Sequence, residues 1–566
     1  MGPMAKPIRQ ALKYTHPDYE AARLALQQEE QQQAFDFAFK QDQSALEVQA
    51  NKIFERIRIT EHERILSVSG PEADKKFYSA LSAIETSDLM RIARRAPKGA
   101  LLHCHFDAML PPETMIPVAQ EMHNMHIRCT VPLATPCSFV EALPEMRLLT
   151  QTEAAAMSHV NIFHEDYSLE TWMPYRNFRQ QFPTGEQAAD KWLVSKILLQ
   201  KHDAYSPERT NLETSIWKCM NNSMRINRGL LRYERAWREY IRRIIWNLAE
   251  DGICYAEIRF AMHYGSTVTT DNGERTLSHE EMLEIVQEVL QQEKEKLGRR
   301  EILFYGIKII YANLRGCTQW EMKWCIDDVI HLKQRYPDLI CGFDLCGQED
   351  AGKPLSFWVS DLVDMQKQCQ KLGLDIPFIL HAGETLDDGG EADSNLYDAV
   401  LLGTKRIGHG YSLLKHPFLI EICKERNIAI EICPTSNELL GLCEQIQAHP
   451  VYALLARSVP CTINTDDPGF WGYLETFYYP VAYYVTTTNQ YYRSSSSHEL
   501  YQLTIGSRKI SLPGWKRLAE WSFDYSCMDE DEKICRQKRF QEDWQLFCTW
   551  IVENFPDVKQ DEGDAS

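Results

Sequence analysis

Two histidines separated by one residue lie inside an apolar stretch early in the chain. In LLHCHFDAML, residues 101–110, His103 and His105 flank a cysteine, and Asp107 follows at the same spacing. Alternate residues of a β-strand point to one face, so a strand here would carry both imidazoles and the carboxylate on the same side. Imidazole nitrogens and carboxylate oxygens are common zinc ligands in hydrolytic sites. Because an isolated pair of this kind is more often structural, the segment indicates a metal site only if partners occur elsewhere.

Further residues of ligand or acid–base type stand near the ends of other short apolar runs. PFILHAGE contains His381 and Glu384, KRIGHGYSL places His409 between two glycines, and PCTINTDDP contains adjacent aspartates. Each alone has an ordinary explanation, such as a solvated loop carboxylate or a helix cap. Chance and capping do not explain why they share the same end of successive runs. The residues expected to meet in one site are His103, His105, Asp107, Asp344, Gly347, His381, Glu384, His409, Asp466 and Asp467.

Eight apolar, β-branched runs supply the strands that would position these side chains. Amphipathic helical stretches, such as LSFWVSDLVDMQKQCQKLG, separate the later runs. Buried strands that alternate with helices are typical of parallel βα units, and eight units predict an α/β fold, a (β/α)8 TIM-like barrel. The C-terminal ends of barrel strands face the active site, which is where the polar residues stand. The runs span residues 100–108, 252–262, 303–312, 339–347, 377–384, 405–413, 428–437 and 460–468.

Several segments lie outside a minimal barrel. Residues 1–96 are rich in Gln, Glu and Ala at helical spacing, which predicts an N-terminal helical extension. The barrel is expected over 97–545, with a long helical insertion at about 109–251, after strand one, that covers the barrel mouth. Residues 546–566 hold the end of a C-terminal helix and an acidic tail that we expect to be disordered. The Tyr-rich stretch at 477–492 is expected to belong to the core or to an interface.

Composition argues against two classes of partner. The 566 residues carry a formal net charge of −19, whereas nucleic acids and anionic membranes attract a basic surface. No apolar run reaches membrane-spanning length. The 17 cysteines are odd in number and include no CxxC pair, which favours free thiols in a reducing compartment. The N-terminus lacks the apolar region of a signal peptide, so we expect a cytoplasmic protein with no nucleic-acid or membrane partner, export without a signal being the alternative.

Six motifs in fixed order connect the chain to a known family. They read PKGALLHCHFDA, GFDLCGQED, LHAGET, RIGHGYSL, CPTSN and NTDDPGF. Over about residues 97–545 the chain resembles the adenosine deaminases, and more closely their growth-factor-like branch, whose members are often secreted. The resemblance implies zinc-dependent hydrolytic deamination of adenosine, and of 2′-deoxyadenosine, to the inosine form with release of ammonia, in purine nucleoside catabolism or salvage. It also implies a homodimer formed through the N-terminal extension.

The resemblance assigns the metal and acid–base residues position by position. Glu384 would protonate the purine ring nitrogen next to the attacked carbon, so its pKa must be raised by a dry site if it is to hold a proton at neutral pH. His409 would orient and deprotonate the attacking water. Related two-metal hydrolases use a modified lysine at a strand end; the fourth run here offers no lysine, which favours one zinc per subunit. The implied zinc ligands are His103, His105, His381 and Asp466, the last of which also counts as catalytic.

The resemblance also assigns three substrate contacts. The backbone of Gly347 and the side chain of Asp467 would contact the purine ring, and Asp107 would bind the ribose 5′-hydroxyl. One departure from the best-known branch is Ala108, which stands where a glycine is usual and adds only a small Cβ. Nothing readable in the insertion separates ribose from deoxyribose.

Two other functions remain open at this stage. One is deamination of AMP or of an N6-modified purine nucleotide, which ranks lower because an unpaired Asp107 carboxylate would repel a phosphate. The other is a weakly catalytic, growth-factor-like signalling protein, which the complete set of metal and acid–base residues argues against.

Overall fold

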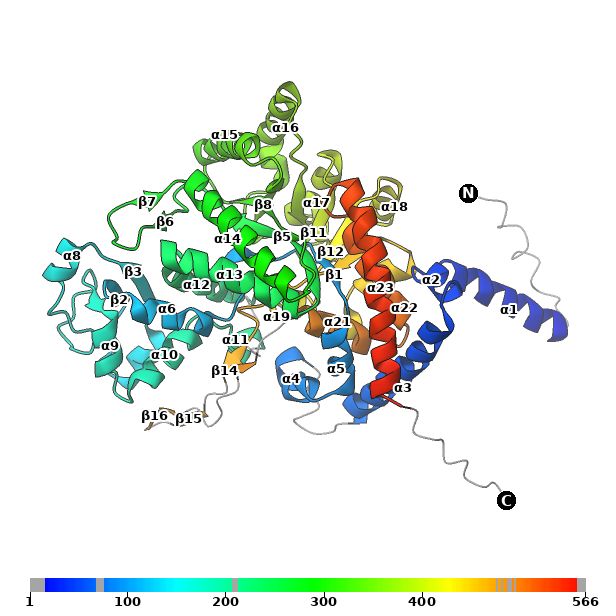
Figure 1. The fold of residues 1–566 in the computed structure, drawn as a ribbon, viewed down its shortest axis with the longest axis horizontal. Helices are drawn as coiled ribbons and strands as arrows, with labels where there is room; N and C mark the ends of the chain where they lie inside the picture. Colours follow the sequence, from blue (N-terminus) through cyan, green and yellow to red (C-terminus); the bar gives the residue numbers. More distant parts are fainter. Residues whose placement is uncertain are drawn as a thin grey trace, which may run out of the picture.

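The computed structural model describes residues 16–67, 76–205, 212–474, 477–479, 482–485, 491–492 and 495–556. Its centre is a barrel of parallel strands wrapped by helices, with further elements at either end (Figure 1). The acidic tail from residue 557, residues 480–481 and 486–490 of the Tyr-rich stretch, and the side chains of the rest of that stretch lie outside what the structure describes, so neither expectation about them is tested. Within the described part of the chain, no helix combines the length and the apolar character needed to cross a bilayer.

Two four-stranded parallel sheets form the barrel wall. Their orders are β1-β5-β8-β9 and β10-β11-β12-β13, so each strand lies beside the next one of the barrel in sequence. Isolated bridges join the two sheets, between Phe343 and Phe378 on one side and between Cys104 and Asp466 on the other. The predicted α/β barrel is thereby confirmed. The strands are β1 (Gly99–Leu101), β5 (Ile253–Ala261), β8 (Gly306–Leu314), β9 (Ile340–Cys346), β10 (Ile379–Ala382), β11 (Arg406–His409), β12 (Ala429–Ile432) and β13 (Cys461–Ile463).

The sequences of the helices around the barrel strands explain where each helix begins and which of its faces is buried. In α14 (His279–Arg299), the Ser278 hydroxyl accepts from the Glu281 amide while the Glu281 carboxylate accepts from the Ser278 amide, a capping box that satisfies two free donors. The apolar residues of α14 lie on one face, which is buried against the barrel. The other helices that follow barrel strands are α15 (Gln319–Arg335), α16 (Leu355–Leu372), α17 (Glu391–Leu401), α18 (Pro417–Glu425) and α20 (Val451–Ala456).

The first and the seventh predicted strands are shorter than expected. β1 ends at Leu101, and Asp107 lies in a 3₁₀ helix, Phe106–Ala108, so the expectation that it shares a strand face with the two histidines is wrong. Likewise, β12 ends at Ile432, and the PTSN residues open a short helix, α19 (Pro434–Leu439), with Pro at its first position.

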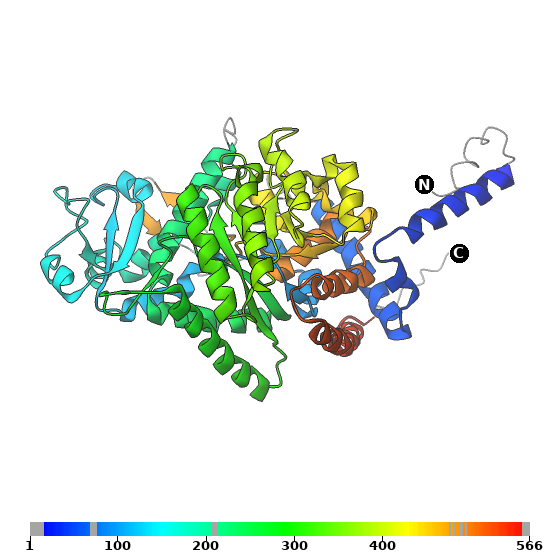
Figure 2. The same ribbon diagram turned by 90° about the horizontal axis from the view of Figure 1, so that it is seen from above.

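The segment between β1 and β5 builds a separate lobe at one end of the molecule (Figures 1 and 2). Besides helices, it contains a three-stranded antiparallel sheet in the order β3-β2-β4, which the sequence analysis did not predict. Its strands are β2 (Met125–Cys129), β3 (Pro144–Leu148) and β4 (Met173–Pro174), and its longer helices include α9 (Tyr175–Gln181), α10 (Glu186–Ser195), α12 (Leu212–Leu231) and α13 (Glu234–Glu250). Of these, α12 continues to the mouth of the barrel.

The N-terminal helices lie at the opposite end. A hydrogen bond from Ser511 to Asp36 and an ion pair between Lys516 and Glu47 tie them to α22 (Leu512–Asp524). The C-terminal helix α23 (Glu530–Asn554) packs against α3, whereas α1 projects clear of the rest of the molecule in both views (Figures 1 and 2). The N-terminal helices are α1 (His16–Gln32), α2 (Phe37–Gln41), α3 (Ala45–Ser67), α4 (Phe77–Glu85) and α5 (Asp88–Arg95).

Candidate active site

The barrel brings the predicted site residues to one cavity at the C-terminal ends of its strands. Its wall also includes Trp217, Met220 and Met224 of α12. His103 lies just beneath, fully buried, in contact with the rings of His105, His381 and His409. The predicted residues that line the cavity are His105, Asp107, Gly347, His381, Glu384, His409, Asp466 and Asp467.

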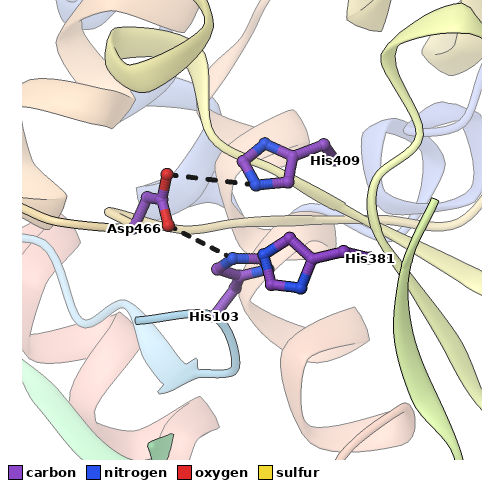
Figure 3. Close-up of side chains that lie close together, drawn as sticks. All are labelled: His103, His381, His409 and Asp466. Carbon is purple, nitrogen blue, oxygen red and sulfur yellow. Dashed lines mark ion pairs between the residues drawn. The ribbon is translucent and has the colours of Figure 1, made fainter. Parts of the chain in front are cut away.

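The Asp466 carboxylate faces His103 and His409 from one side of the histidine group (Figure 3). Its Oδ1 is 3.3 Å from Nε2 of His103 and 3.2 Å from Nε2 of His105, and its Oδ2 is 3.9 Å from Nε2 of His409. His103, His381, His409 and Asp466 each offer one atom within 4.8 Å of the atoms offered by the others. Four residues of types that bind zinc therefore converge on one small volume.

The atoms that face this volume fit a metal ion. Nε2 of His103 and Oδ1 of Asp466 are buried and have no hydrogen-bond partner among the described residues. Ligands of a tetrahedral zinc, each about 2.1 Å from the ion, lie about 3.4 Å apart, close to the separations around Asp466. A cation there would satisfy buried atoms that otherwise carry a desolvation cost.

Carboxylates hold the far nitrogens of two imidazoles. Nδ1 of His103 is 2.7 Å from Glu431 Oε2, and Nδ1 of His381 is 2.6 Å from Asp344 Oδ2. A carboxylate can only accept, so each Nδ1 carries the proton and each Nε2 presents a lone pair to the cavity. Asp344, expected from its strand-end position to lie at the site, thus orients a candidate ligand.

Two buried arginines join these carboxylates inside the barrel. Arg259 donates to Asp344 and to Glu431 at 2.7 Å each, and Arg406 donates to Glu431 at 2.6 Å and to Glu257 at 2.7 Å. Burial alone would raise the pKa of Glu431, but the guanidinium groups of Arg259 and Arg406 outweigh it and hold that pKa below its usual range. Sequence analysis missed Glu257, Arg259, Arg406 and Glu431; the available signal was a charge inside an apolar strand, as in AEIRF and IAIEI.

Glu384 has the properties of a proton donor. Burial, the charge of Asp466 and that of Glu349 raise its pKa well above the usual range, as expected from the sequence. Its Oε1 lies 3.4 Å from Nε2 of His409. The pKa of Asp467 is also raised, first by burial and then by Asp466. A carboxyl group that keeps its proton in a dry cavity can donate it to a bound base.

The backbone is closely packed at one position of the site and adopts unusual angles at two others. Gly408 carries no side chain, and a Cβ there would lie 3.1 Å from His103 Cε1 and 3.2 Å from the His381 Cα. His409 and Asp466 adopt φ angles of 61° and 58°, which non-glycine residues rarely do. Such strain is stored where the surrounding structure enforces it, commonly at functional sites.

Asp107 is not the unpaired carboxylate that the sequence analysis assumed. Arg232 Nη2 donates to both of its oxygens at 2.8 Å, and Arg228 Nε donates at 3.2 Å. Burial raises the pKa of Asp107, but these two arginines outweigh it and lower the pKa below its usual value. The argument that Asp107 would repel a phosphate therefore fails, because two cations face one anion.

Comparison with known proteins identifies the family. Residues 209–533 match the family model described as adenosine deaminase. The adenosine deaminase of Phlebotomus duboscqi is 31% identical over 474 residues, covering 83% of this chain and 80% of that protein. Human adenosine deaminase 2 is 26% identical over 473 residues, covering 83% of this chain and 82% of that one. The chain belongs to the adenosine deaminase family.

Solved structures of family-like barrels agree with the fold. An amidohydrolase from Burkhoderia ambifaria with bound Zn superposes with a TM-score of 0.51 at 15% identity, covering 82% of this chain and 94% of that one. The N6-mAMP deaminase of Arabidopsis gives 0.50 at 17% identity, covering 80% and 99%. At these identities the likeness shows the fold alone. The family, the barrel and the hydrolase class expected from the sequence are confirmed.

The carboxylate behind His381 gives a first testable prediction for this adenosine deaminase family member. Asp344→Asn should weaken zinc binding about 10–100-fold, because an amide holds the imidazole less firmly in the tautomer that binds metal. Competition with a chromogenic chelator would measure it. Asp328→Asn is the matched control, since Asp328 pairs with Nδ1 of His279 at 2.7 Å away from the site. Equal zinc affinity in Asp344→Asn and the control would contradict the assigned role.

Proposed function

We propose that this chain is a zinc-dependent hydrolase that converts adenosine and 2′-deoxyadenosine to the inosine form and ammonia. The observation that carries the proposal is the buried cluster of imidazoles around Asp466, with Glu384, whose pKa is raised by burial and by the charge of Asp466, beside it. The names of the curated relatives, adenosine deaminase and adenosine deaminase 2, support the same substrate class.

The proposed metal site holds one zinc ion per subunit. Zinc, when bound, supplies a Lewis acid that activates a water molecule as a nucleophile near neutral pH. His105 is preferred to His409 as a ligand because its Nε2 lies nearer to Asp466, 3.2 Å against 3.9 Å. The proposed ligands are His103, His105, His381 and Asp466.

The remaining residues act on the purine nucleoside. Glu384 gives its proton to the ring nitrogen next to carbon 6, which makes that carbon electrophilic. His409 contacts the attacking water, whose addition gives a tetrahedral carbon from which ammonia leaves. Asp467 and the backbone of Gly347 contact the ring. Asp107, held by Arg228 and Arg232, accepts a hydrogen bond from the ribose 5′-hydroxyl.

Ammonia release tests this proposal directly. The purified protein is expected to deaminate adenosine and 2′-deoxyadenosine, followed by the absorbance change of the purine, and a zinc chelator should stop the reaction. Glu384→Gln should lower kcat about 10²–10⁴-fold, because a side-chain amide is too weak an acid to transfer a proton to the purine. Full activity in Glu384→Gln would refute the acid assignment. If the wild type released no ammonia from any purine, the growth-factor-like signalling function would be the better explanation.

A second candidate is deamination of AMP or of an N6-modified purine nucleotide. The observation in its favour is the pair of arginines at Asp107, where a 5′ substituent would lie. Arg228 also lines the cavity and its side chain is 34% exposed, so it can meet a ligand. Guanidinium groups are common phosphate partners.

Rates on adenosine and AMP separate the two candidates. The main proposal predicts a higher kcat/KM for adenosine, and Arg228→Gln should change the two substrates alike. If the nucleotide is the substrate, AMP is preferred and Arg228→Gln lowers its kcat/KM about 10–100-fold, the value of a hydrogen bond to a charged group. Arg91→Gln, an exposed arginine paired with Asp88, is the control.

We also propose a homodimer formed through the N-terminal extension. In support, α1 stands clear of the body and exposes Tyr19, Leu24 and Leu26, each more than half accessible. Light scattering should give about twice the 65.7 kDa chain mass, and Leu24→Glu with Leu26→Glu should halve it. Leu401→Glu, at another exposed leucine, should leave the mass unchanged. A monomeric wild type would refute the proposal.

We also propose a cytoplasmic location, with secretion as the alternative. All 17 cysteines are free thiols and most are buried, as is usual where the surroundings are reducing. Fractionation of the source cells distinguishes the two locations.

A further inference from the structure

The CPTSN motif lies against the active site, yet the proposed function gives it no task. Its residues open α19, where Ser436 Oγ donates to Asp466 Oδ2 at 2.7 Å. The next residue, Asn437, lies 3.1 Å from Nδ1 of His409 through its side-chain nitrogen. The far side of the Asn437 amide meets His449, whose Nε2 is 3.0 Å from Oδ1. We call His449, Asn437 and His409 the relay, and all three side chains are buried.

The direction of every hydrogen bond in this relay follows from one backbone amide. The N–H of Val451 donates to Nδ1 of His449 at 3.1 Å, and a backbone amide can only donate. Nδ1 of His449 is therefore unprotonated, and its Nε2 carries the proton of the neutral ring. Burial lowers the pKa of His449 to about 3, which keeps the ring neutral.

The same logic carries through Asn437 to the catalytic histidine. Nε2–H of His449 donates to Oδ1 of Asn437, so the amide presents its NH₂ group to His409. Nδ1 of His409 must then accept, and the neutral ring carries its proton on Nε2. That nitrogen faces Glu384 Oε1 at 3.4 Å and Asp466 Oδ2 at 3.9 Å.

The proton of His409 therefore lies on the opposite ring nitrogen from the protons of His103 and His381. Nδ1 of His103 and of His381 donate to carboxylates, which leaves each Nε2 free to bind a metal. Nδ1 of His409 accepts from an amide, which leaves its Nε2 occupied by a proton. A protonated nitrogen has no lone pair for a metal ion.

We propose that Asn437 and His449 are positioning residues that hold the proton of His409 on Nε2, so that His409 stays out of the metal ligand set and donates a hydrogen bond to the attacking water. The catalytic half of this statement rests on the proposed function; the tautomer does not. The family resemblance implied that His409 also takes a proton from the water. With Nε2 already protonated, the neutral ring orients the water without accepting from it, and the proton of the water would pass to the Asp466 carboxylate, whose Oδ2 lies 3.9 Å from that nitrogen.

The tautomer can be observed without any assay of activity. Neutron diffraction on crystals exchanged into D₂O should place deuterium on Nε2 of His409 and none on its Nδ1. The internal standards are His103 and His381, which should show deuterium on Nδ1. Deuterium on Nδ1 of His409 would overturn the proposal, whatever the substrate of the protein is.

Asn437→Asp reverses the polarity of the relay with almost no change in shape. The new carboxylate accepts from Nδ1–H of His409, so the deuterium should move to Nδ1. We expect kcat to fall about 100-fold, the usual effect of losing one donor in a transition state, with KM and zinc content little changed. Asn272→Asp, on the exposed hairpin between β6 (Val268–Thr269) and β7 (Thr276–Leu277), is the matched control and should match the wild type.

His449 allows a second, milder test. His449→Gln keeps an N–H group for Asn437 and should retain most of kcat, whereas His449→Phe removes the donor and should behave like Asn437→Asp. Wild-type kcat in both Asn437→Asp and His449→Phe would overturn the positioning role. Because the wild type is assayed on purines in parallel, failure of the proposed function would appear there and would leave the neutron result to decide the tautomer.

Discussion

The active site depends on one interaction, the buried bridge that Arg259 makes between Asp344 and Glu431. These two carboxylates come from β9 and β12, which β10 and β11 separate along the barrel wall, and each holds the Nδ1 atom of a different histidine of the site. Two anions in a dry barrel would repel each other and lose their water at high cost. The guanidinium fork offsets both effects and fixes the angle at which His103 and His381 present their Nε2 atoms. Breaking one partner of such a network typically costs about 3–5 kcal/mol of stability.

In the rest of the site, the hydrogen-bond partner of each Nδ1 atom decides what the Nε2 atom of that histidine presents to the cavity. Carboxylates accept and turn a lone pair toward the cavity, whereas the Asn437 amide donates and turns a proton toward it. Three histidines of identical chemistry thereby acquire two different functions. Ser436 and Asn437 are adjacent in sequence and serve both kinds of group, Asp466 and His409.

Much of this could be predicted from the sequence, and the remainder was lost for identifiable reasons. Apolar runs located the eight strands, and ligand-type residues at matching ends located the cavity. Strand alternation failed at Asp107, because β1 ends at Leu101 and a 3₁₀ helix follows. The partners Arg228, Arg259 and Glu431 could not be assigned, because nothing in a sequence shows which charges on distant helices and strands meet. The direction of the His449 relay depends on one amide of a helix start, which only coordinates reveal.

The seam where the barrel closes has a consequence for its assembly. β1 and β13 are joined beyond their ends, where the Asp466 amide donates to the His103 carbonyl at 3.2 Å and the His105 amide donates to the Asp466 carbonyl at 3.1 Å. The residues that complete the cylinder are therefore the same ones that offer side chains to the proposed zinc. The ion would hold this joint together, between segments more than 350 positions apart in the chain. Closure of the barrel would then also complete the metal site. In a molecule in which this joint is open, the proposed ligands on its two sides would lie apart and the site would be incomplete.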